Sequence, residues 1–277
     1  MKKLGLIAGM GELPKAIAIE ARQKGFHVTA VALEPLADSS LSSYVDDIRW
    51  INVGKLGEII DSLKHSAVSD VVMAGKVPKS LLYKSRITPD LRAIKLLLTL
   101  KDRSDDSIML AIMREMEKDG IKLLNTTDFC SDMLMNSGVL TKKGPTEEEW
   151  DDIRFGWRVA KEIGRLDIGQ TVVVKNQAVM AVEAIEGTDE AIKRGGYYAN
   201  EGAVVVKVSK PQQDMRFDVP VVGIDTLRAM MEVKARVLAI ETGKSILLQK
   251  EHFIRDAEDA GISVVGYRDD IDQVCPK

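Results

Sequence analysis

Short apolar runs alternate with helical segments through the first half of the chain, and this alternation constrains the fold more than any other feature. Strand signals lie at Leu4–Ala8, His27–Leu33, Ile48–Val53, Val71–Ala74 and Ile121–Leu124, and helical signals at Pro14–Lys24, Leu56–His65, Leu91–Leu100 and Ser107–Lys118. Strands that alternate with helices in this way form a parallel sheet with helices on its faces. We therefore predict a Rossmann-like parallel-sheet domain over residues 1–136.

The pattern changes near Ser137–Pro145, a mostly polar stretch that carries both glycine and proline. Thr146 follows, with Glu149 three residues later, which is the signature of a capping box at a helix N-terminus. We interpret residues 137–145 as a linker and residues 146–277 as a second domain.

The second half indicates hairpins as well as helices. Thr171–Val174 and Val179–Val182 flank Lys175-Asn176-Gln177, which predicts one hairpin. Val237–Ile240 and Ile246–Leu248 flank a turn at 241–244, which predicts another. Further strands are expected at Ala203–Val208 and Phe217–Val222, and helices at Asp225–Val233 and Glu251–Ala260. The second domain is therefore expected to be mixed α/β.

Composition excludes several classes of protein. The formal charge of −3 provides no basic footprint, so nucleic acid is not an expected partner. The two cysteines lie far apart in the sequence, and none of the three histidines lies near them, so neither a disulfide framework nor a zinc site is expected. No apolar stretch approaches the ~18 residues of a membrane span. We expect a cytoplasmic protein.

The loop after the first strand begins Gly9-Met10-Gly11, which is similar to a dinucleotide fingerprint. Pro14 stands where the third glycine would be, so the fingerprint fails. The loop still places backbone N–H groups at a helix N-terminus, which favours an anion, although a tight turn would have the same sequence. Gly75-Lys76 closes another parallel strand, where open α/β sheets bind ligands. An ordinary surface lysine is the alternative there.

The densest polar clusters are three loops of the second half. They span Asp167–Gln170, Glu183–Asp189 and Lys207–Pro220. Carboxylate oxygens suit Mg²⁺, while lysine and arginine suit phosphate oxygens. Surface ion pairs are the competing interpretation for any single residue.

Several of these motifs, taken in order, resemble one family. They are Ile7-Ala8-Gly9-x-Gly11-Glu12-Leu13-Pro14, Ala74-Gly75-Lys76, Asp167-x-Gly169-Gln170, Glu183-Ala184-Ile185-Glu186-Gly187-Thr188-Asp189 and Lys210-Pro211-x-Gln213-Asp214-x-Arg216-x-Asp218-x-Pro220. Together the motifs resemble the UDP-2,3-diacylglucosamine diphosphatase family of the LpxI type. The resemblance implies hydrolysis to UMP and 2,3-diacylglucosamine 1-phosphate in lipid A synthesis, with Mg²⁺ and with the substrate held between two domains.

The resemblance also implies roles for residues. The essential carboxylate maps to Asp218, with Asp225 as the competing assignment. Asp218 would share a Mg²⁺ ion, or a Mn²⁺ ion, with Asp214 and Asp189. Lys207 and Arg216 would contact phosphate. The other expected substrate-binding residues are Gly9, Gly11, Glu12, Pro14, Gly75 and Lys76 on the uridine side, and Gly169, Gln170, Gly187, Thr188 and Gln213.

The two acyl chains of such a substrate need an apolar groove. Met109, Met113 and Met116 recur at helical spacing and are followed by Met133 and Met135, although an ordinary core helix would give the same spacing. The expected partners are the UDP-diacylated glucosamine, its lipid product, the surface of the inner membrane and a second copy of the chain. The alternatives are an NAD(P)-dependent oxidoreductase and a non-catalytic nucleotide-sugar-binding protein.

Overall fold

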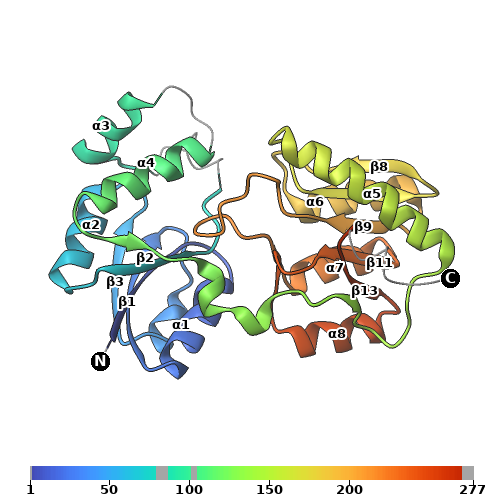
Figure 1. The fold of residues 1–277 in the computed structure, drawn as a ribbon, viewed down its shortest axis with the longest axis horizontal. Coiled ribbons are helices and arrows are strands. Elements are labelled where there is room, and N and C mark those ends of the chain that lie inside the picture. Colours follow the sequence, from blue (N-terminus) through green and yellow to red (C-terminus); the bar gives the residue numbers. More distant parts are fainter. Residues whose placement is uncertain (1, 79–86, 101–104, 270–277) are drawn as a thin grey trace. The chain divides into compact units, whose positions relative to one another are not determined.

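The computed structural model describes residues 2–78, 87–100 and 105–269, which form two compact units (Figure 1). Unit 1 comprises Met1–Ser131 together with Met215–Phe217, and unit 2 comprises Asp132–Asp214 and Asp218–Lys277. A three-residue segment from late in the sequence thus belongs to the N-terminal unit.

Unit 1 contains a five-stranded sheet in the order β3-β2-β1-β4-β5, and all its neighbouring strands are parallel. The strands are β1 (Lys2–Ala8), β2 (Phe26–Glu34), β3 (Asp47–Asn52), β4 (Asp70–Ala74) and β5 (Lys122–Leu123). The predicted Rossmann-like parallel sheet is confirmed. From β1 the chain adds β2 and β3 on one side, and it then adds β4 and β5 on the other.

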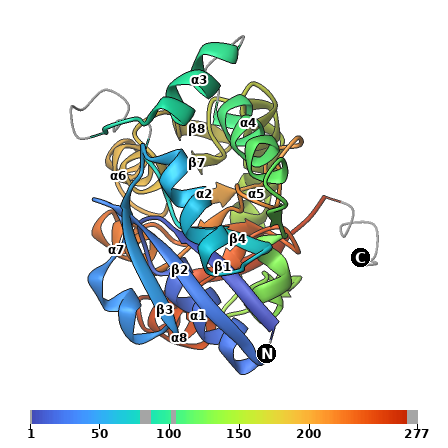
Figure 2. The same cartoon turned by 90° about the vertical axis from the view of Figure 1, so that its left-hand side faces the viewer.

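Helices cover both faces of this sheet. They are α1 (Leu13–Gln23), α2 (Leu56–His65), α3 (Leu91–Thr99) and α4 (Asp105–Glu117), with α1 across the sheet from α2 (Figures 1 and 2). Met113 and Met116 of α4 are 6% and 1% exposed and lie in the hydrophobic core with α2. These two methionines pack as an ordinary core helix predicts, rather than lining a groove.

Unit 2 contains a six-stranded sheet in the order β6-β13-β11-β9-β7-β8. Its strands are β6 (Gly138–Val139), β7 (Thr171–Lys175), β8 (Ala178–Val182), β9 (Val204–Lys207), β11 (Val237–Glu241) and β13 (Ser263–Tyr267). β9, β11 and β13 are parallel, while β6, β7 and β8 run antiparallel to their partners. The predicted mixed sheet and the β7–β8 hairpin are confirmed.

Alternate residues of these strands supply two separate cores, one on each face of the sheet. Val204 and Val206 pack with Trp157 of α5 (Glu147–Arg165), whereas Val205 packs on the opposite face. That face is covered by α6 (Thr188–Ala199), α7 (Ile224–Glu232) and α8 (Lys250–Asp259). Both bonds of the predicted capping box are present at the start of α5. The unit is therefore a sheet between two helical layers.

Two predicted elements of unit 2 are wrong. The 237–248 hairpin does not form, because β12 (Ile246–Leu247) pairs in parallel with β10 (Val221–Val222) instead of with β11. The predicted strand Phe217–Val222 is reduced to β10, because residues 215–217 form a turn.

The stretch interpreted as a linker, 137–145, is part of unit 2. β6 pairs with β13, and the backbone N–H of Leu140 donates to the carbonyl of Val264 at 2.9 Å. The chain has already passed into unit 2 at Asp132.

Candidate functional site

The carboxyl ends of β1 and β4 mark the place in unit 1 where the strand order reverses. In open α/β sheets the two loops that leave such a point diverge to opposite faces and leave a crevice in which ligands bind. Gly9–Glu12 follows β1 and Gly75-Lys76 follows β4, and these strands are neighbours. The structure therefore brings together the two glycine motifs found in the sequence.

Backbone contacts lock these two loops to each other. The N–H of Gly9 donates to Ala74 at 2.8 Å, and Met10 and Lys76 exchange backbone hydrogen bonds of 3.0 and 2.8 Å. A Cβ on Gly9 would lie 2.9 Å from the Lys76 carbonyl oxygen, and one on Gly75 would lie 2.8 Å from the Gly9 carbonyl carbon. Both glycines are required by this close approach, whether or not they touch a ligand.

The rest of the first loop is more open. Gly11 has φ +103 and no heavy atom near the position of a Cβ, so only its backbone conformation requires glycine. Glu12 is exposed and pairs with Lys15 at 3.0 Å, while Pro14 is buried in the first turn of α1. Gly11 exposes backbone without a side chain, and the side chains of Met10 and Glu12 are exposed on either side of it.

A third segment, residues 215–217, is anchored at the same edge of unit 1 by Thr126. The N–H of Thr126 donates to Met215 at 3.2 Å. Its Oγ1 lies 3.1 Å from the carbonyl oxygen of Arg216 and 3.0 Å from that of Met73 in β4, and it can donate to either. Phe217 packs on the hydrophobic core of the unit. Sequence reasoning missed Thr126, because it lies in a plain polar run with no specific signal.

The turn around this segment is closed by the N–H of Asp218, which donates to the carbonyl of Asp214 at 2.9 Å. Both aspartates are half-buried. Asp218 therefore lies outside a strand, although the predicted strand Phe217–Val222 contained it. Instead, Asp214 and Asp218 stand at the two ends of one turn, with Arg216 between them.

Unit 2 holds a buried polar chain at the start of α6. Thr188 Oγ1 donates to Glu183 at 3.0 Å and accepts from Lys207 Nζ at 2.9 Å. All three residues are less than a tenth exposed. Gly187 is the N-cap of α6, with φ +88. The Lys207 ammonium and the N-terminus of α6 bring positive charge to this place, and the buried Glu183 carboxylate balances part of it.

Gly169 and Gln170 border this chain. A Cβ on Gly169 would lie 2.1 Å from the carbonyl oxygen of Glu183, so no other residue fits there. The backbone of Gln170 accepts from Val208 at 2.9 Å and donates to a Glu183 carboxylate oxygen at 3.4 Å. Its side-chain Oε1 is buried and has no hydrogen-bond partner.

An ion pair between a half-buried lysine and a buried glutamate, which sequence reasoning missed, fixes the chain just after β9. Glu241, 2% exposed, accepts from Lys161 Nζ at 2.5 Å and from the N–H of Ser209 at 2.7 Å. Lys161 also donates to the Ser209 carbonyl at 2.9 Å, and burial lowers the pKa of this lysine. The available signal was a glutamate ending the apolar strand Val237–Ile240.

Gln213 extends that anchor into the next loop. Its Oε1 accepts from the N–H of Lys210 at 2.7 Å and from the Ser209 hydroxyl at 3.1 Å, which fixes the orientation of the amide. Its Nε2 is buried without a partner. Lys210 itself pairs with Asp167 at 2.6 Å. The amide thus presents a donor that an acceptor on a ligand could satisfy.

The remaining carboxylates are placed differently from one another. Asp189 accepts from the Thr226 hydroxyl at 2.9 Å, and Asp225 pairs with Arg228 at 3.0 Å with its side chain 78% exposed. Within the described ranges, which include Asp189, Asp214 and Asp218, no three His, Cys, Asp or Glu side chains group so as to hold a metal. Mg²⁺ binding stays a prediction.

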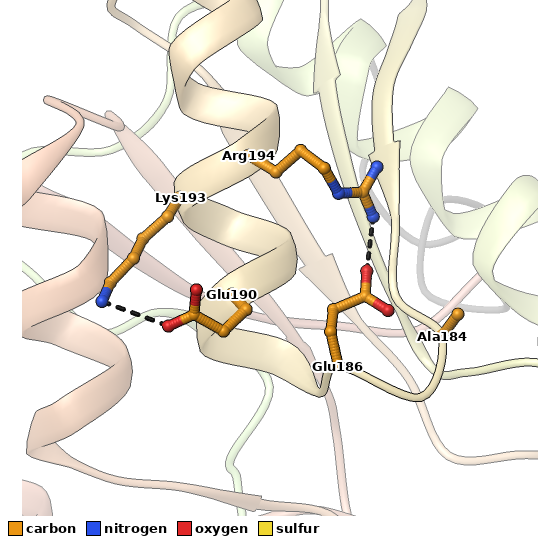
Figure 3. A pocket seen from close by; sticks show the side chains of 5 residues that line it. All are labelled: Ala184, Glu186, Glu190, Lys193 and Arg194. Carbon is orange, nitrogen blue, oxygen red and sulfur yellow. Dashed lines mark hydrogen bonds and ion pairs between the residues drawn. The ribbon is translucent and has the colours of Figure 1, made fainter.

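An open depression lies beside the first turns of α6 (Figure 3). Its lining residues are Ala184, Glu186, Glu190, Lys193 and Arg194. Arg194 pairs with Glu186 at 2.5 Å and Lys193 with Glu190 at 3.2 Å. The charges of this depression neutralise each other, and Thr188 and Lys207 are not part of its lining.

Among the helices that the structure describes, none is long and apolar enough to cross a membrane. Among solved structures, similarity is found to UDP-glucose-4-epimerase from Stenotrophomonas maltophila (13% identity, TM-score 0.31, covering 44% of this chain and 35% of that one). Similarity is also found to N5-carboxyaminoimidazole ribonucleotide synthetase from Thermotoga maritima (17% identity, TM-score 0.26, covering 68% and 43%). Likenesses this weak support no inference.

Comparison of sequences is far more specific. The family model of the LpxI N-terminal domain matches residues 3–133, and that of the LpxI C-terminal domain matches residues 136–265. The chain is 33% identical to UDP-2,3-diacylglucosamine pyrophosphatase LpxI from Caulobacter vibrioides, over 96% of this chain and 98% of that protein. The chain therefore belongs to the LpxI family.

Proposed function

We propose that this protein hydrolyses the pyrophosphate bond of UDP-2,3-diacylglucosamine, giving UMP and 2,3-diacylglucosamine 1-phosphate for lipid A synthesis. The observation that carries the proposal is the end-to-end match to a pyrophosphatase of that name. The oxidoreductase alternative is not favoured, since both halves of the chain match the two domains of one hydrolase family.

The edge of unit 1 suits the nucleotide part of the substrate. Gly9–Glu12 and Gly75-Lys76 lie at the reversal of strand order, and Gly11 and Gly75 are exposed there without side chains. Backbone donors and acceptors of this kind recognise the flat edge of a base or ribose hydroxyls. We assign the uridine to this edge, with Lys76 near the first phosphate.

The polar chain of unit 2 suits the pyrophosphate. Lys207 is buried, and Thr188 and Gly187 stand at the N-terminus of α6. The unpartnered Nε2 of Gln213 supplies a further donor. Arg216 and Lys207 are the cations assigned to phosphate oxygens, because developing negative charge must be neutralised during attack by water.

Asp218 is assigned to the metal or to the attacking water, with Asp214 beside it in the same turn. Mg²⁺ commonly takes one or two protein carboxylates plus substrate phosphates and water, so a pair at the ends of one turn fits it better than a closed cage. Asp189 is the third predicted ligand. When bound, the ion would neutralise the pyrophosphate and orient water.

The test is direct assay of products. The purified protein is incubated with UDP-2,3-diacylglucosamine in mixed micelles with Mg²⁺, and UMP and the lipid 1-phosphate are measured by mass spectrometry. Equal molar release of both is expected. Release of UDP would mean cleavage of a different bond, and tight substrate binding with no product would favour the non-catalytic binding protein.

A further inference from the structure

Helix α3 of unit 1 is held by its polar side. Arg92 donates to Glu115 of α4 at 2.8 Å and also pairs with Asp119, which follows α4. Asp90 caps the helix by accepting from Ala93 at 2.8 Å, and its other oxygen accepts from Gly57 of α2 at 2.7 Å. These charged contacts fix the helix against α2 and α4.

The apolar side of α3 faces outward. Leu91 is 76% exposed, Leu98 is 79% exposed and Ile94 is 41% exposed, while Leu96 is the helix's buried residue. Positions i, i+3 and i+7 lie on one side of a helix, so these three side chains form a continuous stripe. Lys95 is exposed beside them. α3 lies at the periphery of unit 1 (Figures 1 and 2).

This arrangement reverses that of an ordinary surface helix, which buries its apolar stripe and exposes its charges. Single exposed leucines are common on soluble proteins, but an exposed stripe marks an interaction surface. Helix α2 of the same unit follows the ordinary rule, since its Ile59, Ile60 and Leu63 are buried.

The sequence around α3 is strongly basic. Between positions 76 and 103 the sequence has eight lysines or arginines and two aspartates, although the whole chain has a formal charge of −3. Arg92 is engaged with Glu115 and Asp119, Lys76 and Lys95 are exposed, and the other five cationic residues lie outside the described ranges. An apolar helical stripe in a basic stretch of chain is the pattern of a helix that lies in the interface of an anionic membrane.

We propose that the α3 stripe, made up of Leu91, Ile94 and Leu98 with Lys95 at its border, docks unit 1 on an anionic lipid surface. The choice of a lipid surface over a protein partner rests on this charge complementarity and on the proposed function, whose substrate and product are both diacylated lipids. Docking would place the enzyme where those lipids reside.

The test measures binding to vesicles that contain no substrate, so it is independent of catalysis. Full-length protein is floated with vesicles of phosphatidylcholine containing increasing phosphatidylglycerol. Leu91→Ser/Leu98→Ser should lower the partition coefficient at least ~10-fold, because each leucine buried in the interface contributes about a factor of ten. Leu166→Ser is the matched control, because Leu166 is 58% exposed in unit 2, and it should change partition by less than about twofold.

A charge variant separates the two contributions. Lys95→Gln should weaken binding about fivefold on anionic vesicles and very little on phosphatidylcholine alone. Leu98→Trp provides a second readout that requires no loss of binding. The fluorescence emission of the introduced tryptophan should shift to the blue when the protein binds anionic vesicles. Unchanged partition of the folded double variant, or no blue shift, would overturn the proposal.

Activity distinguishes failure of this inference from failure of the proposed function. The double variant should lose most of its turnover on substrate embedded in vesicles and keep it on substrate dispersed in detergent. If the protein binds vesicles but releases no UMP, the proposed function is wrong and the docking surface is still supported. A dimer in solution that the double variant abolishes, with vesicle binding intact, would assign the stripe to a second copy and overturn docking.

Discussion

The candidate site of unit 1, after β1 and β4, is formed mainly by backbone, whereas that of unit 2, at the ends of β9 and β11, is formed mainly by side chains. The edge of unit 1 is made of backbone: Gly9 and Gly75 let two loops touch, and hydrogen bonds between Met10 and Lys76 hold them. The edge of unit 2 at the ends of β9 and β11 is made of buried and half-buried side chains: Glu241 with Lys161, and Lys207 with Thr188. In the proposed function the first edge recognises the nucleotide by shape, and the second provides charge for the pyrophosphate.

This contrast predicts how each edge fails. In unit 1, adding a side chain to a glycine should lower the stability of the protein or its affinity for the nucleotide. In unit 2, removing a charged side chain should lower turnover or leave its partner as an uncompensated buried charge. Variants at each edge therefore separate recognition from chemistry.

Removal of divalent metal should have the largest effect. Pyrophosphate cleavage requires neutralisation of concentrated negative charge, which we assign to Mg²⁺ at Asp218 and Asp214. EDTA should reduce UMP release to background, and Mg²⁺ or Mn²⁺ should restore it. The assay is release of UMP with and without chelator, with thermal midpoint as a control for folding. Full activity in EDTA would rule out the metal mechanism.

Asp218→Ala should reduce turnover at least ~10²-fold, the lower range for a positioned acid–base group. Asp225→Ala is the control, because its carboxylate is mostly exposed and forms a surface ion pair with Arg228. We expect that variant to keep turnover within about twofold. UMP release and thermal midpoint are measured for both. A selective loss in Asp225→Ala would move the catalytic role to that residue.

Sequence patterns predicted elements that depend on local contacts. Strand–helix alternation indicated the parallel sheet of unit 1, and Asn176 and Gln177 adopt the positive φ values of a tight hairpin. The pairing of strands that are distant in the sequence could not be predicted. The turn at 241–244 is typical of a hairpin, yet β12 pairs with β10 instead.

The same limit applies to the candidate site. The motifs located the glycine loops and the polar loops, because those depend on residue type at short spacing. They did not reveal that Thr126 holds residues 215–217 in unit 1, or that Glu241 holds Ser209, because each bond joins segments that are distant in sequence. The assignment of Asp218 to the strand Phe217–Val222 failed because its backbone hydrogen bond to Asp214 closes a turn there.

Glu241→Ala should destabilise the protein by about 3 kcal/mol, because it leaves the Ser209 N–H without its acceptor and the half-buried Lys161 ammonium without its counter-charge, with the Ser209 carbonyl as its remaining acceptor. Glu186→Ala is the control, since its pair with Arg194 lies at the surface depression, and we expect a change of less than about 1 kcal/mol. Urea unfolding measures both. Equal effects would mean that the buried pair contributes no more than a surface pair.

The smallest predicted effect tests the backbone edge of unit 1 with two glycines that share a positive φ. Gly11→Ala should cost about 1 kcal/mol, from backbone strain alone, because nothing lies near the position of its Cβ. Gly75→Ala carries the same strain and also places a Cβ 2.8 Å from the carbonyl carbon of Gly9, so its cost should be about 2–3 kcal/mol.

Because the added methyl separates the two loops, Gly75→Ala should also weaken UMP binding, while Gly11→Ala should change it by less. Urea unfolding gives the first quantity and calorimetric titration with UMP gives the second. If both variants lose the same stability, the loops can separate at no energetic cost. The close contact between Gly9 and Gly75 would then contribute nothing to the stability of this edge.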